Sequence, residues 1–213
     1  MKLVSQTVTE FAAETASSSP APGGGSISAL AGTLSAALGQ MVIRLTEGKK
    51  AFLVLPENIQ VEIKNALSVL ETKHRELLSL IDEDTEAFNS FMAALALPKA
   101  TDEEKAKRAQ AMKEATILSL NVPFKTAQSC CEVLEQLKVL ALHGNKNAIS
   151  DVGVAALMGE AGLNGAIFNV KINLLGLDDE TEKTTKRNEC DALVKKAAQL
   201  KNEVLQIVQE KIS

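Results

Sequence analysis

The sequence contains no tryptophan, no tyrosine and only six phenylalanines, although 46% of its 213 residues are hydrophobic. Its core must therefore be built from alanine, leucine, valine and isoleucine, and alanine-rich packing suits helices in close contact. No stretch alternates with period two for long enough to predict a strand, whereas helical periodicity runs through most of the chain. We predict an all-α fold.

Long clusters of basic residues are also lacking. The formal charge is −4 and the pI is near 5.4, and lysine and arginine occur at most as short, interrupted groups. Nucleic-acid binding requires a basic footprint on the protein surface. We therefore expect no nucleic-acid partner.

Cysteine and histidine are scarce. The three cysteines, Cys130, Cys131 and Cys190, have neither metal-site nor disulfide spacing, and only two histidines accompany them. We expect the cysteines to be reduced and buried as small hydrophobic residues. We expect no metal site and no prosthetic group.

The N-terminus has no apolar signal-peptide core and no small-residue cleavage site, which predicts a cytoplasmic protein. The most apolar segment, residues 27–43, is followed at once by Arg44 and contains four polar residues: Ser28, Thr33, Ser35 and Gln40. It is too polar and slightly too short for a membrane span. We interpret it as a buried central helix and expect no membrane partner.

Capping and breaking residues divide the chain into about six helices. The predicted ranges are 7–16, 26–47, 56–97, 101–143, 150–177 and 178–213. Ser26 is the predicted N-cap of the second helix, and Pro123 should break or kink the fourth. Several helices approach forty residues, or about 60 Å. We predict one domain over residues 1–213, an elongated up-and-down bundle that forms a homodimer.

Two polar residues, His74 and Asp84, interrupt the apolar stripe of the third predicted helix. Burying a carboxylate in such a stripe costs on the order of several kcal/mol of folding free energy unless the group is paired or hydrogen-bonded. Asp84 is explained either by a structural pair or by a general acid/base role with a pKa moved by burial. Asp82 lies about 200° from Asp84 around the helix, so we expect it to be solvated. His74 is best explained as a core or rim histidine.

A second stripe, on the fifth predicted helix, carries small residues and two amides: Gly162, Ala166, Asn169, Asn173 and Gly176. Close helix contact explains the small residues. Buried amides need partners, and they would also suit the donor–acceptor edge of a flat heterocycle. Asp151 lies near the start of the same helix, where a capping role explains it at least as well as a catalytic one.

The segment Pro22-Gly23-Gly24-Gly25-Ser26 precedes a helix N-terminus. Three glycines expose backbone N–H groups and admit a ligand closely, so an anion or oxygen atom could bind there. A glycine triplet alone is a weak signal. Lys49 and Lys50, just after the second predicted helix, could bind a carboxylate or could form a solvated pair.

A series of motifs in order resembles the cyclodeaminase/cyclohydrolase family that acts on tetrahydrofolate. The motifs are residues 19–26, 45–50, 81–88, 97–99, 149–156 and 168–173. The resemblance implies an all-helical, dimeric or larger enzyme without a metal. It also implies one of two reactions, hydrolysis of 5,10-methenyltetrahydrofolate to the 10-formyl form or release of ammonia from the 5-formimino form.

The resemblance further implies a catalytic aspartate in the Asp-x-Asp-x-x-Ala-Phe region. The stripe favours Asp84, with Asp82 as the fallback, and the choice among Asp82, Asp84 and Asp151 stays open. An ionised carboxylate would stabilise the amidinium cation of the methenyl compound, accept a proton from the attacking water and return it to N5. The expected substrate-binding residues are Pro22, Gly23, Gly24, Gly25, Ser26, Lys49, Lys50, Asp151, Asn169 and Asn173.

Residues 101–105 and 176–179 look more like stand-alone cyclohydrolases than like the deaminase domain of bifunctional enzymes. We therefore expect cyclohydrolase activity first and cyclodeaminase activity as the alternative. A rival from another class is a non-catalytic helical dimerisation module. It would explain the long helices but not the polar residues on the core stripes.

Overall fold

The computed structural model describes residues 2–213, which contain seven α-helices, three short 3-10 helices and no strand. The α-helices are α1 (Val8–Thr15), α2 (Gly24–Thr46), α3 (Lys50–Leu53), α4 (Glu57–Leu95), α5 (Asp102–His143), α6 (Ile149–Asn173) and α7 (Glu180–Ile212). The 3-10 helices are Leu3–Ser5, Lys146–Ala148 and Leu174–Gly176. The predicted all-α fold is confirmed.

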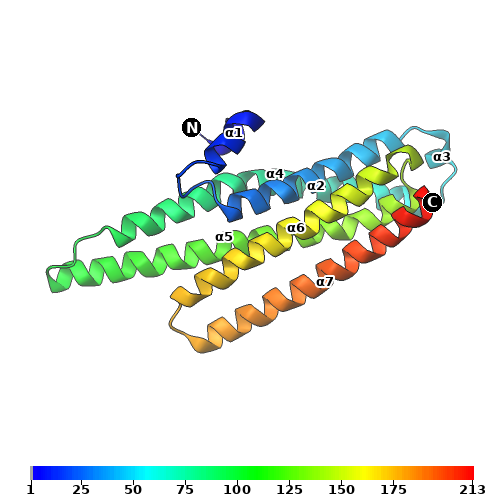
Figure 1. The fold of residues 1–213 in the computed structure, drawn as a ribbon. Coiled ribbons are helices and arrows are strands. Elements are labelled where there is room, and N and C mark those ends of the chain that lie inside the picture. Colours follow the sequence, from blue (N-terminus) through cyan, green and yellow to red (C-terminus); the bar gives the residue numbers. More distant parts are fainter. Residues whose placement is uncertain (1) are drawn as a thin grey trace.

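The five long helices run side by side in an elongated bundle (Figure 1). Helix α2 packs against α4, α5 and α6, while α7 covers α5 and α6. Helices α4 and α5 extend beyond the turn between α6 and α7, and the short helix α1 lies outside the bundle (Figure 1). The α4–α5 hairpin therefore presents part of its length without cover from α6 and α7.

Capping interactions are present at the start of two of the helices. Capping boxes join Thr7 to Glu10 at the start of α1 and Thr101 to Glu104 at the start of α5. The predicted cap at Ser26 is wrong, because α2 begins at Gly24 with Gly23 as N-cap. Ser26 is the third helical residue, and its hydroxyl contacts α4 instead. Pro123 was expected to break or kink its helix, and it does not break it, since α5 is continuous through this residue.

Glycines allow α2 to sit at the centre of the bundle. A Cβ atom on Gly32 would lie 2.5 Å from Sγ of Cys130, and one on Gly39 would lie 2.9 Å from Cδ1 of Leu70. On α6, a Cβ atom on Gly162 would lie 2.8 Å from the main-chain oxygen of Ser28. These contacts leave no room for a side chain, so glycine at these positions lets α2 pack closely against α4, α5 and α6.

Helix α2 is also the one helix among residues 2–213 that is long and apolar enough to cross a membrane. Within the bundle, 61% of the most apolar 18-residue stretch of this helix is buried. The core helix of a soluble protein has this property, and the interpretation of residues 27–43 as a central helix agrees with it.

Candidate active site

A cavity of about 400 Å³ opens at the N-terminal end of α2. The segment before α2 forms one wall, and α4, α5 and α6 supply the others. The lining residues are Pro20, Ala21, Gly23, Gly24, Gly25, Asp84, Ala87, Phe88, Phe91, Thr116, Ser119, Asn169, Ile172, Asn173 and Gly176. Asp84 is the single charged side chain in this lining, and the others offer amides, hydroxyls or apolar surface.

Asp84 reaches the cavity from α4, and its carboxylate is held from one side by α2. Its Oδ2 atom accepts hydrogen bonds from the backbone N–H of Ser26 at 2.8 Å and from the Ser26 hydroxyl at 3.0 Å. Its Oδ1 atom accepts no hydrogen bond from residues 2–213. Burial raises the pKa of Asp84, while the two hydrogen bonds from Ser26 lower it and oppose that effect. One oxygen is thus anchored, and the other is available for chemistry.

The glycine triplet makes this arrangement possible. A Cβ atom on Gly25 would lie 2.0 Å from Oδ1 of Asp84, which is far inside contact distance. Only glycine lets the first turn of α2 come this close to the carboxylate. The triplet was expected to form an anion site at a helix N-terminus, and the anion found beside it in this structure is the carboxylate of Asp84 itself.

The two predicted amides both line the cavity from α6. Nδ2 of Asn169 donates to the main-chain oxygen of Gly165 at 2.9 Å, and Nδ2 of Asn173 donates to the main-chain oxygen of Ser119. Each side-chain oxygen accepts no hydrogen bond from residues 2–213. The amides therefore have fixed orientations and an acceptor left for a ligand.

Three of the predicted binding residues lie away from this cavity. Lys49 and Lys50 follow the far end of α2, about 33 Å from its first residue at the helical rise. Asp151 lies in the first turn of α6, about 27 Å from Asn169 along that helix. Within one chain, the structure does not bring these residues to the cavity.

Two residues next to the cavity do not line it. Ser26 lies behind Asp84 and contacts it, and Pro22 is buried beside the lining residues Ala21 and Gly23. Both support the wall of the cavity rather than its surface.

Asp82 was expected to be solvated, and this expectation is wrong. Its side chain is buried, with 9% relative exposure, and Oδ1 accepts a hydrogen bond of 2.6 Å from the backbone N–H of Leu3. The physical reason is the N-terminal segment, which covers this face of α4 and whose Leu3 side chain is buried there. Asp82 does not line the cavity.

Several lining residues were not predicted as site residues. Phe88 and Phe91 lie on the same stripe as Asp84, so their spacing was the signal that could have identified them. Thr116 and Ser119 reach the cavity from α5, and no motif in the sequence identifies them as site residues. Their position depends on how α5 is aligned with α4 and α6.

Among residues 2–213, no group of three or more histidine, cysteine, aspartate or glutamate side chains is placed to hold a metal ion. All three cysteines are buried and unpaired by disulfides. Burial raises the pKa of the Cys130 thiol to about 12, so it stays protonated at neutral pH.

The fold and the cavity define an all-helical protein with one partly buried carboxylate in a cavity of small-molecule size. A family model described as formiminotransferase-cyclodeaminase matches residues 7–192. The chain belongs to this family. The resemblance that the motifs indicated is therefore confirmed.

Relatives cover almost the whole chain. A methenyltetrahydrofolate cyclohydrolase from Methylorubrum extorquens is 38% identical over 98% of both chains. A formimidoyltransferase-cyclodeaminase from Gallus gallus is 37% identical over 98% of this chain, which spans 38% of that longer protein. The crystal structure of a formiminotetrahydrofolate cyclodeaminase from Thermotoga maritima superimposes with a TM-score of 0.84 at 26% identity, over 98% of each chain.

Proposed function

We propose that this protein hydrolyses 5,10-methenyltetrahydrofolate to 10-formyltetrahydrofolate, with Asp84 as the proton acceptor and cation stabiliser. The observation that carries the proposal is the Asp84 carboxylate, which has one anchored oxygen and one unbonded oxygen in a cavity with no other charge. Similarity over the full length of a methenyltetrahydrofolate cyclohydrolase supports the choice of substrate.

The reaction needs a group that is negative beside a cation and that moves one proton. The ionised Asp84 stabilises the amidinium cation between N5 and N10. Water adds to the bridging carbon while Oδ1 accepts one of its protons, and the carboxyl then protonates N5 as the bond between N5 and that carbon breaks. The remaining hydroxyl proton of the adduct leaves to solvent as the formyl group forms on N10.

The rest of the lining suits a flat, polar heterocycle. Phe88 and Phe91 offer aromatic faces near Asp84, and such faces stack on planar rings. Asn169 and Asn173 present fixed amides from α6, which match a donor–acceptor ring edge. The carboxylate would therefore lie beside the reactive bridge while the amides hold the ring.

Release of ammonia from 5-formiminotetrahydrofolate is the alternative activity. It is supported by the structural similarity to a formiminotetrahydrofolate cyclodeaminase. The same cation is the product of that reaction, so one site can serve either one. Separate incubations decide between them, with loss of methenyltetrahydrofolate absorbance for the first reaction and ammonia release for the second. If neither reaction occurs and neither folate raises the thermal stability of the protein, the interpretation as a non-catalytic dimerisation module is the one that remains.

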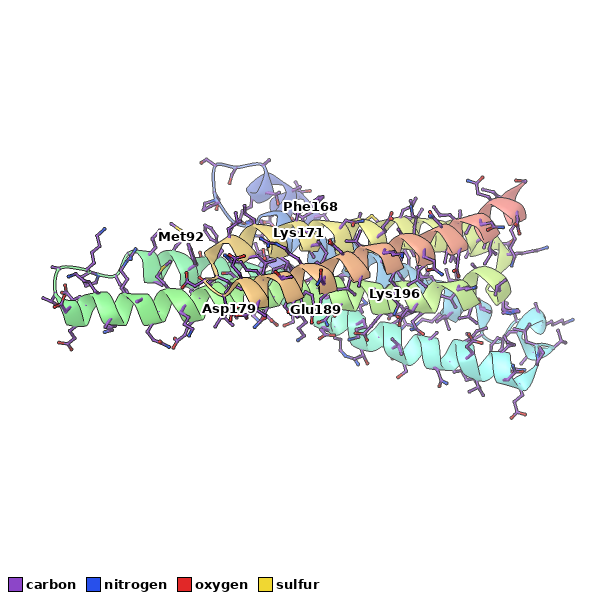
Figure 2. All side chains as sticks on the ribbon, turned by 90° about the horizontal axis from the view of Figure 1, so that it is seen from below. Met92, Phe168, Lys171, Asp179, Glu189 and Lys196 are labelled. Atoms are coloured by element: carbon purple, nitrogen blue, oxygen red, sulfur yellow. The ribbon has the colours of Figure 1, made fainter. Side chains whose placement is uncertain are left out.

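We also propose that the protein is a homodimer that pairs through the outer faces of α2 and α6. The exposed large apolar side chains on these faces are Ile27, Leu34, Met41, Leu45, Val154, Leu157, Phe168 and Ile172. Phe168 is 72% exposed and projects from α6 (Figure 2). Large exposed apolar side chains that gather on adjacent helices are typical of an interface. Light scattering that gave the monomer mass at micromolar concentration would refute the dimer.

The spacing of this face suits a two-fold axis. Ile27 and Met41 lie seven residues on either side of Leu34, so an axis at Leu34 pairs Ile27 of one chain with Met41 of the other. The two α2 helices are then antiparallel. This pairing would bring the C-terminal end of the partner's α2, which Lys49 and Lys50 follow, beside the N-terminal end of α2, where the cavity opens.

Folates end in glutamate carboxylates, and we propose that Lys49 and Lys50 bind this tail at the cavity of the partner subunit. Changing both Lys49→Ala and Lys50→Ala should raise KM for polyglutamylated substrate more than it lowers kcat, because the tail binds alike in ground and transition states. Unchanged KM would return the pair to the status of surface charges.

Mixed dimers test whether the lysines act across subunits. In a mixture of the double lysine variant with Asp84→Asn, a mixed dimer keeps one cavity with both the aspartate and the partner lysines. About a quarter of all sites in an equal, randomly paired mixture should then show the original KM. If the lysines act within their own chain, no site in the mixture recovers it.

We further propose a cytoplasmic location without membrane or nucleic-acid partners. The buried position of α2 and the net charge of −4 support this proposal. Recovery of the protein in the membrane fraction after cell lysis would contradict it.

A further inference from the structure

The Ser26 side chain is fully buried, and its Oγ atom lies among three oxygen atoms of α4. The distances from Oγ are 2.9 Å to the main-chain oxygen of Ile81, 3.0 Å to Oδ2 of Asp84 and 3.3 Å to Oγ1 of Thr85. A hydroxyl has one proton, so Ser26 donates to one of these oxygens at a time, and the two nearer ones belong to Ile81 and Asp84. The charge of Asp84 decides which acceptor is stronger.

Ionised Asp84 is the stronger acceptor, because hydrogen bonds to charged groups are stronger than those between neutral groups. In that state Oδ2 receives both the N–H and the hydroxyl of Ser26. Once Asp84 takes a proton, Oδ2 weakens as an acceptor. The hydroxyl proton can then turn to the oxygen of Ile81 without any movement of Oγ.

Charged groups on the neighbouring helices do not bond the carboxylate of Asp84 in place of Ser26. No titratable side chain of α2, α5 or α6 lines the cavity with Asp84. On α6, Lys171 pairs with Asp191, and on α5, Lys125 pairs with Glu76. On α4 itself, Asp82 is bonded to the N-terminal segment. Ser26 is the group that bonds the carboxylate of Asp84 directly.

We propose that Ser26 is a positioning residue whose hydroxyl follows the charge of Asp84, so that it holds Oδ2 of the ionised carboxylate and leaves Oδ1 to exchange the proton with substrate. This inference rests on the proposed role of Asp84. A donor that bonds the carboxylate favours its ionised form, so the hydroxyl lowers the pKa of Asp84 against the effect of burial. Ser26 thereby extends activity toward acid pH.

The test is the pH dependence of kcat/KM in Ser26→Ala. Loss of the hydroxyl should raise the pKa of Asp84 and move the acid limb of the profile to higher pH. On that limb kcat/KM should fall several-fold further than it falls on the plateau, where the loss reports only the poorer positioning of the carboxylate. A titration of the Asp84 carboxyl by carbon NMR should move in the same direction. Ser26→Thr keeps the hydroxyl and should restore the acid limb.

Ser35→Ala is the matched control. Ser35 lies on the same helix, is equally buried, and donates to the main-chain oxygen of Ala155 at 2.7 Å. It should lower thermal stability without moving the acid limb. If Ser26→Ala does not fold, Ser26→Cys fills nearly the same space with a weaker donor and should displace the limb by a smaller amount.

The outcomes separate the two proposals. An unmoved acid limb and an unmoved carboxyl titration in the folded Ser26 variant would overturn the role of Ser26, while Asp84 could still be catalytic. Full activity of Asp84→Asn would instead overturn the proposed role of Asp84. The NMR titration would then still report whether Ser26 controls the ionisation of that carboxyl.

Discussion

Asp82 and Asp84 lie two residues apart on α4, and both are at least partly removed from water, but their surroundings differ. Asp82 faces the N-terminal segment, where the backbone N–H of Leu3 donates to it at 2.6 Å. Asp84 faces the start of α2 and the cavity, with Oδ2 anchored by Ser26. Each carboxylate has one oxygen that accepts no hydrogen bond from residues 2–213, but of the two residues only Asp84 lines the cavity.

This difference teaches that burial alone does not identify a catalytic carboxylate. Both side chains satisfy the rule that buried acids need partners. What separates them is whether a free oxygen faces a space large enough for a substrate. Asp84 has that space, whereas the contact at Asp82 joins the N-terminal segment to the bundle.

The largest expected effect comes from Asp84→Asn. The amide keeps the shape of the side chain but loses the charge and the proton acceptor, so kcat should fall roughly 10²–10⁴-fold. Folding should be retained, because the carboxylate has no ion-pair partner among residues 2–213 that the change would leave unpaired. Steady-state kinetics and thermal unfolding on the same sample provide the measurement. A folded, fully active variant would show that Asp84 is not the catalytic carboxylate.

The next effect should come from Gly25→Ala, which acts on the surroundings of Asp84 and not on the residue itself. The new methyl group would overlap Oδ1 of Asp84, at 2.0 Å, and would force the carboxylate away from its position. A displacement of about 1 Å can cost on the order of 10²-fold in rate, so kcat/KM should fall about 10–10²-fold.

The control for this variant is Gly153→Ala. Its methyl group would meet Cγ1 of Val208 at 3.3 Å, far along α6 from the cavity. It should change stability but not kcat/KM. Equal losses of activity in both variants would show that Gly25 has no special relation to Asp84.

A smaller and different effect is expected for Asp82→Asn. The amide oxygen is a weaker acceptor for the N–H of Leu3 than the carboxylate is, and the new NH2 group would be buried without an acceptor. The free energy of unfolding should therefore fall by about 1–2 kcal/mol. The kcat of the folded fraction should stay within about two-fold of the original value. Denaturant unfolding and active-site titration measure the two quantities. A rate loss as large as that of Asp84→Asn would reverse the roles of the two residues.

Much of the fold could be predicted because local chemistry decides helix ends. Capping boxes form at Thr7 and Thr101, where a threonine stands three residues before a glutamate in each sequence. Ser26 shows the limit of such reasoning. A serine before an apolar helix satisfies the N-cap pattern, but here α4 offers its hydroxyl a carboxylate and a carbonyl oxygen, and α2 begins two residues earlier. Tertiary contact outweighed the local preference.

The site could be predicted where a single segment of the chain carries the signal. Asp84 and Asn169 stand out because they interrupt stripes on their own helices. Ser119 reaches the cavity only because α5 has a particular alignment with its neighbours, which no local pattern contains. The mistaken expectation for Asp82 has the same cause, since the segment that covers it lies 79 residues away in the chain.

The last and smallest effect is the pH dependence of stability at Asp84. Burial raises the pKa of this carboxyl in the folded state above its ordinary value of 3.8, in spite of the hydrogen bonds from Ser26. A raised pKa means that the folded state binds the proton more tightly than the unfolded state does. The resulting stabilisation is complete below the unfolded pKa and is lost as pH rises through the folded pKa. The amide introduced by Asp84→Asn does not titrate, so the stability of the variant relative to the original protein should increase between about pH 4 and neutrality. Paired denaturant titrations across that range measure the difference. If the free energy of unfolding of the variant did not increase relative to that of the original protein as pH rose, the hydrogen bonds from Ser26 would offset the effect of burial completely.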